Sequence, residues 1–521
     1  MRSPDLLRGA ASVGGVTMLS RVLGFVRDVV IARAFGAGDA ADAFFVAFRL
    51  PNFLRRLFAE GAFSQAFVPV LAQEAEQHGQ ARAREFFARV YGALLLVVLA
   101  VTVLAVAGAP VLVYAFAPGF ADEPQRFALT VDLLRWTFPY ILFISLAAAA
   151  AGVLNTYGRY AVPAFTPVLL NLSLIGCALL LAPELEQPVM ALGVGVALGG
   201  MAQLAWQLPA LARLGLLPAP RFGFRHADVR RVVRLMIPAT FGASVQQIGL
   251  LFDTILASFL AAGSVSWLYY SDRLLEFPLG VFGIAIATVI LPGLSRHHSA
   301  ARHEDFRATL DWGVRWVLLI GVPATVGLVV LAGPMLVTLF QYGAFAVQDV
   351  HMARLSLWAY APGLLGFMLV KVLAPGFFSR QDVRTPVRIA IIAVGANMTL
   401  NLVFIVPLQH AGLALATSLS AYVNALLLGV ALHRRGIWSP APGWGSFLLR
   451  LAAAAAAMGA ALLLGVGDLE TWVARSPLER GLWLALWVGT GTVAFAASAW
   501  LLRLPLQMLR APAPRADSPR P

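Results

Sequence analysis

A group of charged side chains lies within two long apolar segments between Ser20 and Gln65, where polar chemistry is costly. The group consists of Arg21, Arg27, Asp28, Arg33, Arg49, Arg55, Arg56 and Glu60. Both segments are long enough to cross a bilayer, and a charged side chain at that depth costs roughly 2.5–3.5 kcal/mol. These side chains must therefore face protein or water rather than lipid. Because a guanidinium group keeps its charge when buried and places two donors on a carboxylate or phosphate, the group predicts an anionic cargo.

The spacing of the charges within the second segment arranges them along one face of a helix. Arg49, Asn52, Arg56 and Glu60 are separated by steps of three and four residues, and Arg55 sits beside this stripe. In the first segment Arg27 shares a face with Ser20, and Asp28 shares the adjoining face with Arg21. We expect the acidic members to hold the arginines in position while the site is empty. The alternative is that some of these residues are internal ion pairs with a purely structural role.

An internal repeat, with an offset of about 223 residues, places a second charged group at the matching position of the other half. The stretch 45–53 aligns with 269–277, and Arg49 falls opposite Arg273. The second group consists of Asp272, Arg273 and Glu276. Two halves related in this way predict two lobes that face a central cationic cavity.

The composition identifies the elements that must position these charges. The chain of 521 residues is 60% hydrophobic and 12% charged, and its mean hydropathy is +0.78, which excludes an ordinary soluble protein. At ~20 residues per crossing, we predict an all-α polytopic membrane protein with about fourteen transmembrane helices. The predicted spans are 10–36, 42–72, 88–117, 128–153, 161–182, 188–212, 233–261, 266–294, 310–340, 350–378, 386–407, 411–432, 446–466 and 480–502.

The spans group into two pseudo-symmetric six-helix lobes and an appendix. We predict an N-lobe at 1–215, a C-lobe at 216–440, two C-terminal helices at 441–505, and a disordered cytoplasmic tail at 506–521. Basic and short acidic connections alternate along the chain, which predicts that both termini lie in the cytoplasm. The same asymmetry accounts for most of the net charge of +13, so no nucleic-acid partner is expected. The N-terminal apolar stretch is interpreted as a retained helix, because no small-residue cleavage site follows it.

Other polar residues within the spans suggest an ion site. Asp253, Asn397, Asn401 and Thr417 carry oxygen atoms that could bind a monovalent cation such as sodium. The alternative is that they form hydrogen bonds between helices. The single cysteine, Cys177, excludes disulfides within the chain. No HExxH, Walker or GxSxG motif is present, so we expect no catalysis and no cofactor other than such a cation.

Three long stretches resemble the MurJ/MviN family of bacterial lipid II flippases. They are SRVLGFVRDVVIARAFGAGDAADAFFVAFRLPNFLRRLFAEGAFSQAFVPVL, GSVSWLYYSDRLLEFPLGVFGIAIATVILP and VKVLAPGFFSRQDVRTPVRIA. The family belongs to the multidrug/oligosaccharidyl-lipid/polysaccharide exporter superfamily. The resemblance implies two six-helix lobes with two extra helices whose groove accommodates a lipid tail. It also implies a multi-pass protein of the bacterial cytoplasmic (inner) membrane.

The resemblance further implies lipid II as cargo, moved between leaflets by alternating access for peptidoglycan biosynthesis. The family's important positions match Arg21, Arg27, Asp28, Asp42, Arg55, Arg56, Glu60, Ser266 and Arg273, and its proposed sodium site resembles Asp253, Asn397, Asn401 and Thr417. Membrane phospholipids and cell-wall synthesis enzymes are the further partners expected. The alternatives are an exporter of another lipid-linked oligosaccharide or a drug, a membrane polyprenyl-phosphate glycosyltransferase, and a scaffold for cell-wall enzymes.

Overall fold

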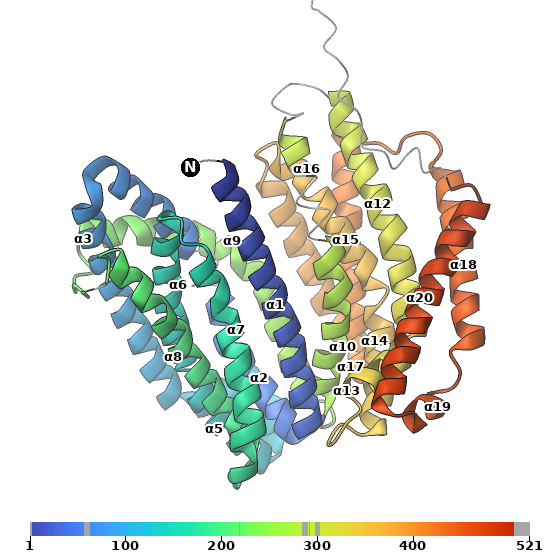
Figure 1. The fold of residues 1–521 in the computed structure, drawn as a ribbon, viewed down its shortest axis with the longest axis horizontal. Helices are drawn as coiled ribbons and strands as arrows, with labels where there is room; N and C mark the ends of the chain where they lie inside the picture. Colours follow the sequence, from blue (N-terminus) through green and yellow to red (C-terminus); the bar gives the residue numbers. More distant parts are fainter. Residues whose placement is uncertain are drawn as a thin grey trace, which may run out of the picture. The chain divides into compact units, whose positions relative to one another are not determined.

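Every regular element in the described part of the chain is a helix (Figure 1), which confirms the predicted all-α membrane fold. The computed structural model describes residues 3–56, 63–217, 219–283, 290, 292–296 and 303–504. Glu60 and the predicted tail at 506–521 lie outside these residues. Within the described ranges, 9 helices are long and apolar enough to cross a membrane. The predicted number of fourteen crossings therefore stays a prediction.

The first compact unit comprises Met1–Ser266 together with Tyr342–Phe345. Its helices are α1 (Ser3–Phe35), α2 (Asp39–Leu54), α3 (Phe63–Ala107), α4 (Ala109–Phe116), η2 (Pro118–Asp122), α5 (Pro124–Thr137), α6 (Tyr140–Thr156), α7 (Ala161–Gly176), η3 (Cys177–Leu181), η4 (Ala182–Glu184), α8 (Met190–Arg213) and α9 (Ala227–Ser258). Helix α3 consists of two helices joined at Gly79, whose φ of 80° favours glycine. The predicted spans 42–72 and 88–117 both contribute to α3.

Close packing of α8 organises the centre of this unit. Helix α8 packs against α6 and α7, and its glycines let the backbones approach. A Cβ atom at Gly199 would lie 2.7 Å from Leu170 of α7, and one at Gly200 would lie 2.9 Å from Tyr140 of α6. Small residues at helix interfaces are typical of membrane proteins, where packing replaces the hydrophobic effect as the driving force.

The second compact unit comprises Trp267–Gln341 together with Ala346–Pro521. Its helices are α10 (Ser264–Pro278, which begins in the first unit), η5 (Leu279–Gly283), α12 (His303–Val330), α13 (Ala332–Phe340), α14 (Val347–Tyr360), α15 (Gly363–Leu373), α16 (Pro375–Phe378), α17 (Arg384–Arg434), α18 (Trp444–Gly465), α19 (Leu469–Ala474) and α20 (Pro477–Leu501). Helix α17 changes direction at Gln409, where φ is 49°. This change of direction separates the predicted spans 386–407 and 411–432.

The division between the compact units differs from the division predicted between the lobes. The boundary between the units in the sequence falls after Ser266. Helix α9 therefore belongs to the first unit, where it packs against α3. An ion pair fastens the two helices, because Arg82 Nη2 of α3 lies 2.6 Å from Asp228 Oδ1 of α9. The lobes were defined by an internal repeat rather than by contacts, and their boundaries at 215 and 440 stay a prediction.

Helices α18 and α20, the predicted C-terminal appendix, run side by side (Figure 1). The start of α20 is encoded locally. Ser476 caps the helix, Pro477 occupies its first position, and Glu479 returns a bond to the Ser476 backbone N–H. The outer faces of the pair are apolar and exposed, with Leu464 89% and Leu449 73% accessible. Such faces suit contact with lipid chains.

Candidate functional site

Arg27 is the most fully positioned of the predicted cargo-binding residues. Its Nη2 and Nε atoms lie 2.6 and 2.9 Å from Oδ1 of the neighbouring Asp28, whose side chain is fully buried. Its Nη1 atom donates to Asn171 Oδ1 of α7 at 3.1 Å. Asn171 in turn donates to the carbonyl oxygen of Ser20 on α1 at 3.1 Å. The structure therefore brings together Ser20, Arg27 and Asp28, as the spacing predicted, and adds Asn171 as the residue that orients them.

The guanidinium of Arg27 keeps access to solvent although its partners are buried. The Arg27 side chain is 13% exposed and the Asp28 side chain 0%. A buried carboxylate beside an arginine stabilises the positive charge and fixes the direction of the guanidinium fork. The arrangement fixes an arginine charge whose side chain is not completely buried.

Arg49 of α2 and Arg55 just after it each donate to a neutral side chain. Arg49 donates from Nη1 to the Thr254 hydroxyl of α9 at 2.8 Å, and Arg55 donates from Nε to Asn52 Oδ1 at 2.9 Å. Arg56 is exposed, as is Arg21 on α1. The predicted stripe on the second segment stays a prediction, and its continuation to Glu60 lies outside the described residues.

Asp42 forms a buried constellation in which its carboxylate accepts four hydrogen bonds. Oδ1 accepts from the backbone N–H of Ser266 at 2.8 Å and from its hydroxyl at 2.5 Å. Oδ2 accepts from the Gly263 N–H at 2.8 Å and from Arg126 Nη2 at 2.7 Å. Asp42 and Ser266 are both 0% exposed. In this conformation they contact each other rather than solvent, and their predicted contact with cargo stays a prediction.

Arg126 completes this constellation, and the sequence analysis did not identify it. Only 3% of it is exposed, and its guanidinium lies 3.8 Å from the centroid of the Phe120 ring while it pairs with Asp42. A signal was available, because Arg126 is a basic residue close to the acidic connection that contains Glu123. The constellation joins α2, α5 and the start of α10, so it holds these three elements together.

The second charged group lies on α10 in the second unit. Arg273 Nη1 donates to Glu276 Oε2 at 2.9 Å, and the two side chains are 27% and 48% exposed. Asp272 is exposed on the same helix. The sequence prediction that acidic neighbours hold Arg273 is met by Glu276. The predicted central cavity would involve residues of both units, and it stays a prediction.

Three residues of the predicted ion site, Asn397, Asn401 and Thr417, lie on α17. Asn397 Nδ2 lies 3.4 Å from Thr417 Oγ1, and Asn401 Nδ2 lies 3.2 Å from Asn397 Oδ1. These contacts are the hydrogen bonds that the sequence analysis gave as the alternative. Asp253 lies on α9, in the first unit. Within the described ranges, no group of three or more His, Cys, Asp or Glu residues could hold a metal ion. The sodium site stays a prediction.

Comparisons with solved structures identify the fold of this chain. One solved structure, a multidrug resistance MATE family transporter of the MOP superfamily in an inward-facing conformation, matches with a TM-score of 0.69 over 82% of this chain and 98% of that chain, at 13% identity. Another, described as lipid II flippase MurJ in the inward closed conformation, matches with a TM-score of 0.80 over 96% of this chain and 99% of that chain, at 24% identity. The chain therefore shares the fold of these two solved structures.

The sequence comparisons identify the family. The profile of the family described as "Lipid II flippase MurJ" matches residues 31–481. A protein of Vibrio cholerae, named probable lipid II flippase MurJ, is 49% identical over 98% of each chain. A protein of Burkholderia cenocepacia, named lipid II flippase MurJ, is 45% identical over 87% of this chain and 88% of its own length. The chain belongs to the MurJ family, which confirms the resemblance found in the sequence.

Proposed function

We propose that this protein is a lipid II flippase, which moves the lipid-linked peptidoglycan precursor from the inner to the outer leaflet of the bacterial cytoplasmic membrane. The single observation that carries the proposal is the Arg27 group, in which a partly exposed arginine in a segment that the sequence predicts to cross the membrane is oriented by Asp28 and Asn171. The names of the MurJ relatives support lipid II as the substrate. No covalent step is needed, so the protein acts as a transporter and not as an enzyme.

The chemistry of the cargo suits this group. A pyrophosphate carries about two negative charges, and hydrogen bonds between ionised groups are roughly twice as strong as neutral ones. Arg27, Arg55 and Arg273 bind the pyrophosphate in our proposal, while the polyprenyl tail remains in lipid along α18 and α20. Asp28 and Glu276 offset part of the positive charge of the three arginines when no cargo is bound, which lowers the cost of an empty site and leaves it positive overall.

Alternating access then moves the headgroup across the membrane without ATP. A negative charge that leaves a cell with a negative interior gains roughly 2.3 kcal/mol per 100 mV. The same potential draws the empty, positively charged site back toward the cytoplasm. The membrane potential therefore favours both halves of the cycle, with both termini of the chain on the cytoplasmic side.

The test is lipid II translocation in proteoliposomes, measured by access of an external enzyme or dye to the headgroup. We expect Arg27→Ala to lower the initial rate by about 10- to 100-fold, because each hydrogen bond between charged groups contributes roughly 1.5–3 kcal/mol. Arg27→Lys should retain part of the rate, since it keeps the charge but not the fork. Arg135→Ala is the matched control, because Arg135 forms an exposed surface pair with Asp132 at 3.1 Å.

Two results would overturn the proposal. Translocation at the wild-type rate in Arg27→Ala would remove the arginine group from the mechanism. Turnover of labelled lipid-linked sugar by the pure protein, without movement between leaflets, would favour a glycosyltransferase instead. Equal rates with and without an imposed potential would refute the proposed driving force while leaving the flippase activity intact.

A further inference from the structure

A four-residue segment, Tyr342–Phe345, belongs to the first compact unit although its neighbours on both sides belong to the second. It lies in the connection between α13 and α14, and we call it the strap. The strap packs against the end of α1, where the Ala344 backbone N–H donates to the carbonyl oxygen of Arg33 at 2.9 Å. The Phe345 side chain is only 1% exposed. The first unit therefore contains a buried segment that comes from a distant part of the chain.

Two glycines allow the strap and α1 to approach this closely. Gly343 has a φ of 57°, and a Cβ atom at this position would overlap the carbonyl oxygen of Arg33. Gly36, directly after α1, has a φ of 66°, and a Cβ atom there would lie 2.5 Å from the carbonyl oxygen of Ala344. Real Cβ atoms essentially never come within 3.0 Å of another residue's atoms. Alanine could therefore not replace either glycine unless the backbone moved.

A second contact of the same kind holds the end of α9. The short helix η2, between α4 and α5, places Gly119 against Ser258, the last residue of α9. The Gly119 N–H donates to Ser258 Oγ at 3.1 Å, and a Cβ atom at Gly119 would overlap the Ser258 carbonyl oxygen. Ser258 is 2% exposed. Here too, a loop backbone lies against a helix end where only glycine fits.

The internal repeat relates the two contacts to each other. At the offset of about 223 residues, the end of α1 at Phe35 matches the end of α9 at Ser258. The first residues of α4 and α5 likewise match those of α13 and α14, so the connection that contains Gly119 matches the connection that contains the strap. In each contact, a connection of one predicted lobe meets the first helix of the other. The two contacts are therefore equivalent, although all their residues belong to the first compact unit.

Both contacts lie beside acidic connections, which the sequence predicts to be outside the cytoplasm. Glu123 follows the Gly119 contact, and Asp349 follows the strap. The two helices that are held also carry parts of the candidate site. Arg27 lies on α1, and Thr254, one turn before the end of α9, accepts a hydrogen bond from Arg49. Holding the ends of α1 and α9 therefore restricts the helices that position the arginines.

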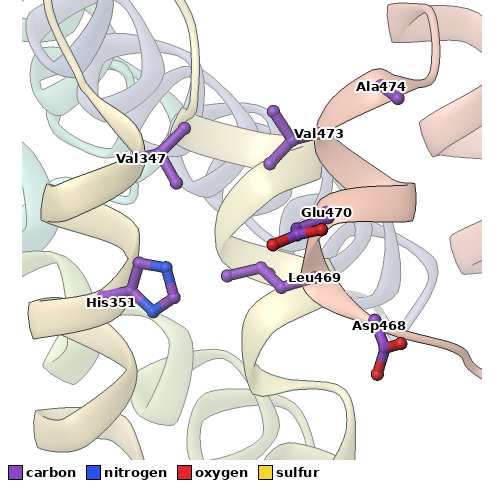
Figure 2. Close-up of a pocket in the computed structure, with 7 residues that line it drawn as sticks. All are labelled: Val347, His351, Asp468, Leu469, Glu470, Val473 and Ala474. Carbon is purple, nitrogen blue, oxygen red and sulfur yellow. The ribbon is translucent and has the colours of Figure 1, made fainter.

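The start of α14, directly after the strap, borders an open pocket within the second unit (Figure 2). Its volume is about 510 Å³. Val347 and His351 of α14 lie on one side of it, and Leu469 and Val473 of α19 lie on the other. Because close-packed side chains resist displacement, this open space lets the first turn of α14 shift when the strap leaves α1.

We propose that the two contacts form one paired lock on the outer side of the protein. The lock consists of the strap on α1 and Gly119 on α9, and both contacts release together when the candidate site opens outward. Closely packed backbones have discrete arrangements rather than a continuous range, which is the physical reason for joint release. The role of the lock in transport rests on the proposed flippase function, whereas the pairing of the contacts does not.

The test disturbs one contact and measures the other. Ser258→Cys in a Cys177→Ala background places a single buried thiol at the α9 contact. The rate at which this thiol reacts with a membrane-impermeant maleimide is measured on the full-length protein in detergent. Adding Gly343→Ala should displace the strap from α1. We expect the thiol to react about 5- to 30-fold faster, as for a closed state destabilised by one strained residue.

Two further variants keep the result interpretable. Gly158→Ala is the matched control, because Gly158 has a φ of 74° but a Cβ atom there would meet nothing within 4 Å; the labelling rate should not change. Phe345→Ala removes the buried side chain of the strap without straining its backbone, and it should accelerate labelling as Gly343→Ala does. Unchanged labelling in both strap variants would overturn the pairing, as would equal acceleration by Gly158→Ala.

A second measurement separates the lock from the flippase activity. In proteoliposomes that contain lipid II, the Ser258→Cys thiol should react faster with external maleimide than in vesicles without it. Arg27→Ala should remove this acceleration, whereas Gly343→Ala should still accelerate labelling in the Arg27→Ala background. If lipid II crosses the membrane while the labelling rate stays constant, the lock has no role in transport. If lipid II does not cross at all, the flippase proposal fails, and the labelling in detergent still decides the pairing.

Discussion

The substitution Asp42→Asn tests whether the buried carboxylate of α2 holds the first unit together. Each oxygen of Asp42 accepts two hydrogen bonds, Oδ1 from Ser266 and Oδ2 from Gly263 and Arg126. Asparagine has nearly the same shape but replaces one oxygen by an NH₂ group. Whichever position that group takes, it faces two donors instead of accepting from them. The change also removes the negative charge beside the guanidinium of Arg126, which is 3% exposed.

The expected loss of stability follows from these contacts. Removing one partner of a buried ion pair costs about 3–5 kcal/mol, and at roughly 2–4 °C per kcal/mol this lowers Tm by about 6–20 °C. Asp39→Asn is the matched control. Asp39 also lies near Arg126, at 3.4 Å, but its side chain is 54% exposed. An exposed pair contributes about 0–1 kcal/mol, so the control should shift Tm by no more than about 4 °C.

The chain contains its own reporter for this measurement. Cys177 is the only cysteine, it is buried, and it belongs to the first unit. A thiol-reactive fluorogenic dye therefore reports the unfolding of that unit during a thermal ramp of the purified protein in detergent. If Asp42→Asn melts within a degree or two of the wild type, or no lower than Asp39→Asn, the reasoning from the buried constellation is wrong.

Two further predictions concern contacts elsewhere in the second unit. Arg480→Met leaves several carbonyl oxygens without their donor. The Tm of this variant, followed by tryptophan fluorescence, should therefore lie well below that of the exposed control Arg135→Met. Equal Tm values would contradict a stabilising role for these hydrogen bonds. Asp382, in the connection before α17, has its pKa lowered to about 2 from an ordinary 3.8, because the Thr385 hydroxyl and N–H donate to it and Arg435 lies beside it. A lowered pKa stabilises the fold above the ordinary value, and this contribution is lost as the pH falls toward 2. Asp382→Asn should therefore lower Tm at pH 7 and have no effect near pH 2; a difference that grows with acidity would contradict this sign.

Much of the site was predictable where the relevant residues are close in sequence. Arg273 and Glu276 are one helical turn apart, so helical spacing places their side chains within reach of each other. Asp28 was expected to hold an arginine because it is an acidic neighbour, although spacing placed it on the face adjoining that of Arg27. The apolar spans were predictable for the same reason, because hydropathy is a property of about 20 consecutive residues. The internal kinks of α3 and α17 fall between spans that the sequence had already separated.

Pairings between distant segments were not predictable in this way. Arg126 is 84 residues from Asp42, and Thr254 is 205 residues from Arg49. Nothing in the local pattern around Asp42 indicates which arginine will reach it, because rotating a helix by a fraction of a turn presents a different side chain. Ser266 illustrates the same limit, since the family resemblance suggested a contact with cargo while its hydroxyl is buried against Asp42.

The sequence by itself determined that this is an all-α membrane protein of the MurJ family with arginines inside its helices. These properties follow from composition, periodicity and long matching stretches, all of which are read along the chain. Only the tertiary structure decided which partner each buried charge has. The physical reason is that the energy of a buried charge depends on atoms within a few ångströms in space, and helix packing alone determines which atoms those are.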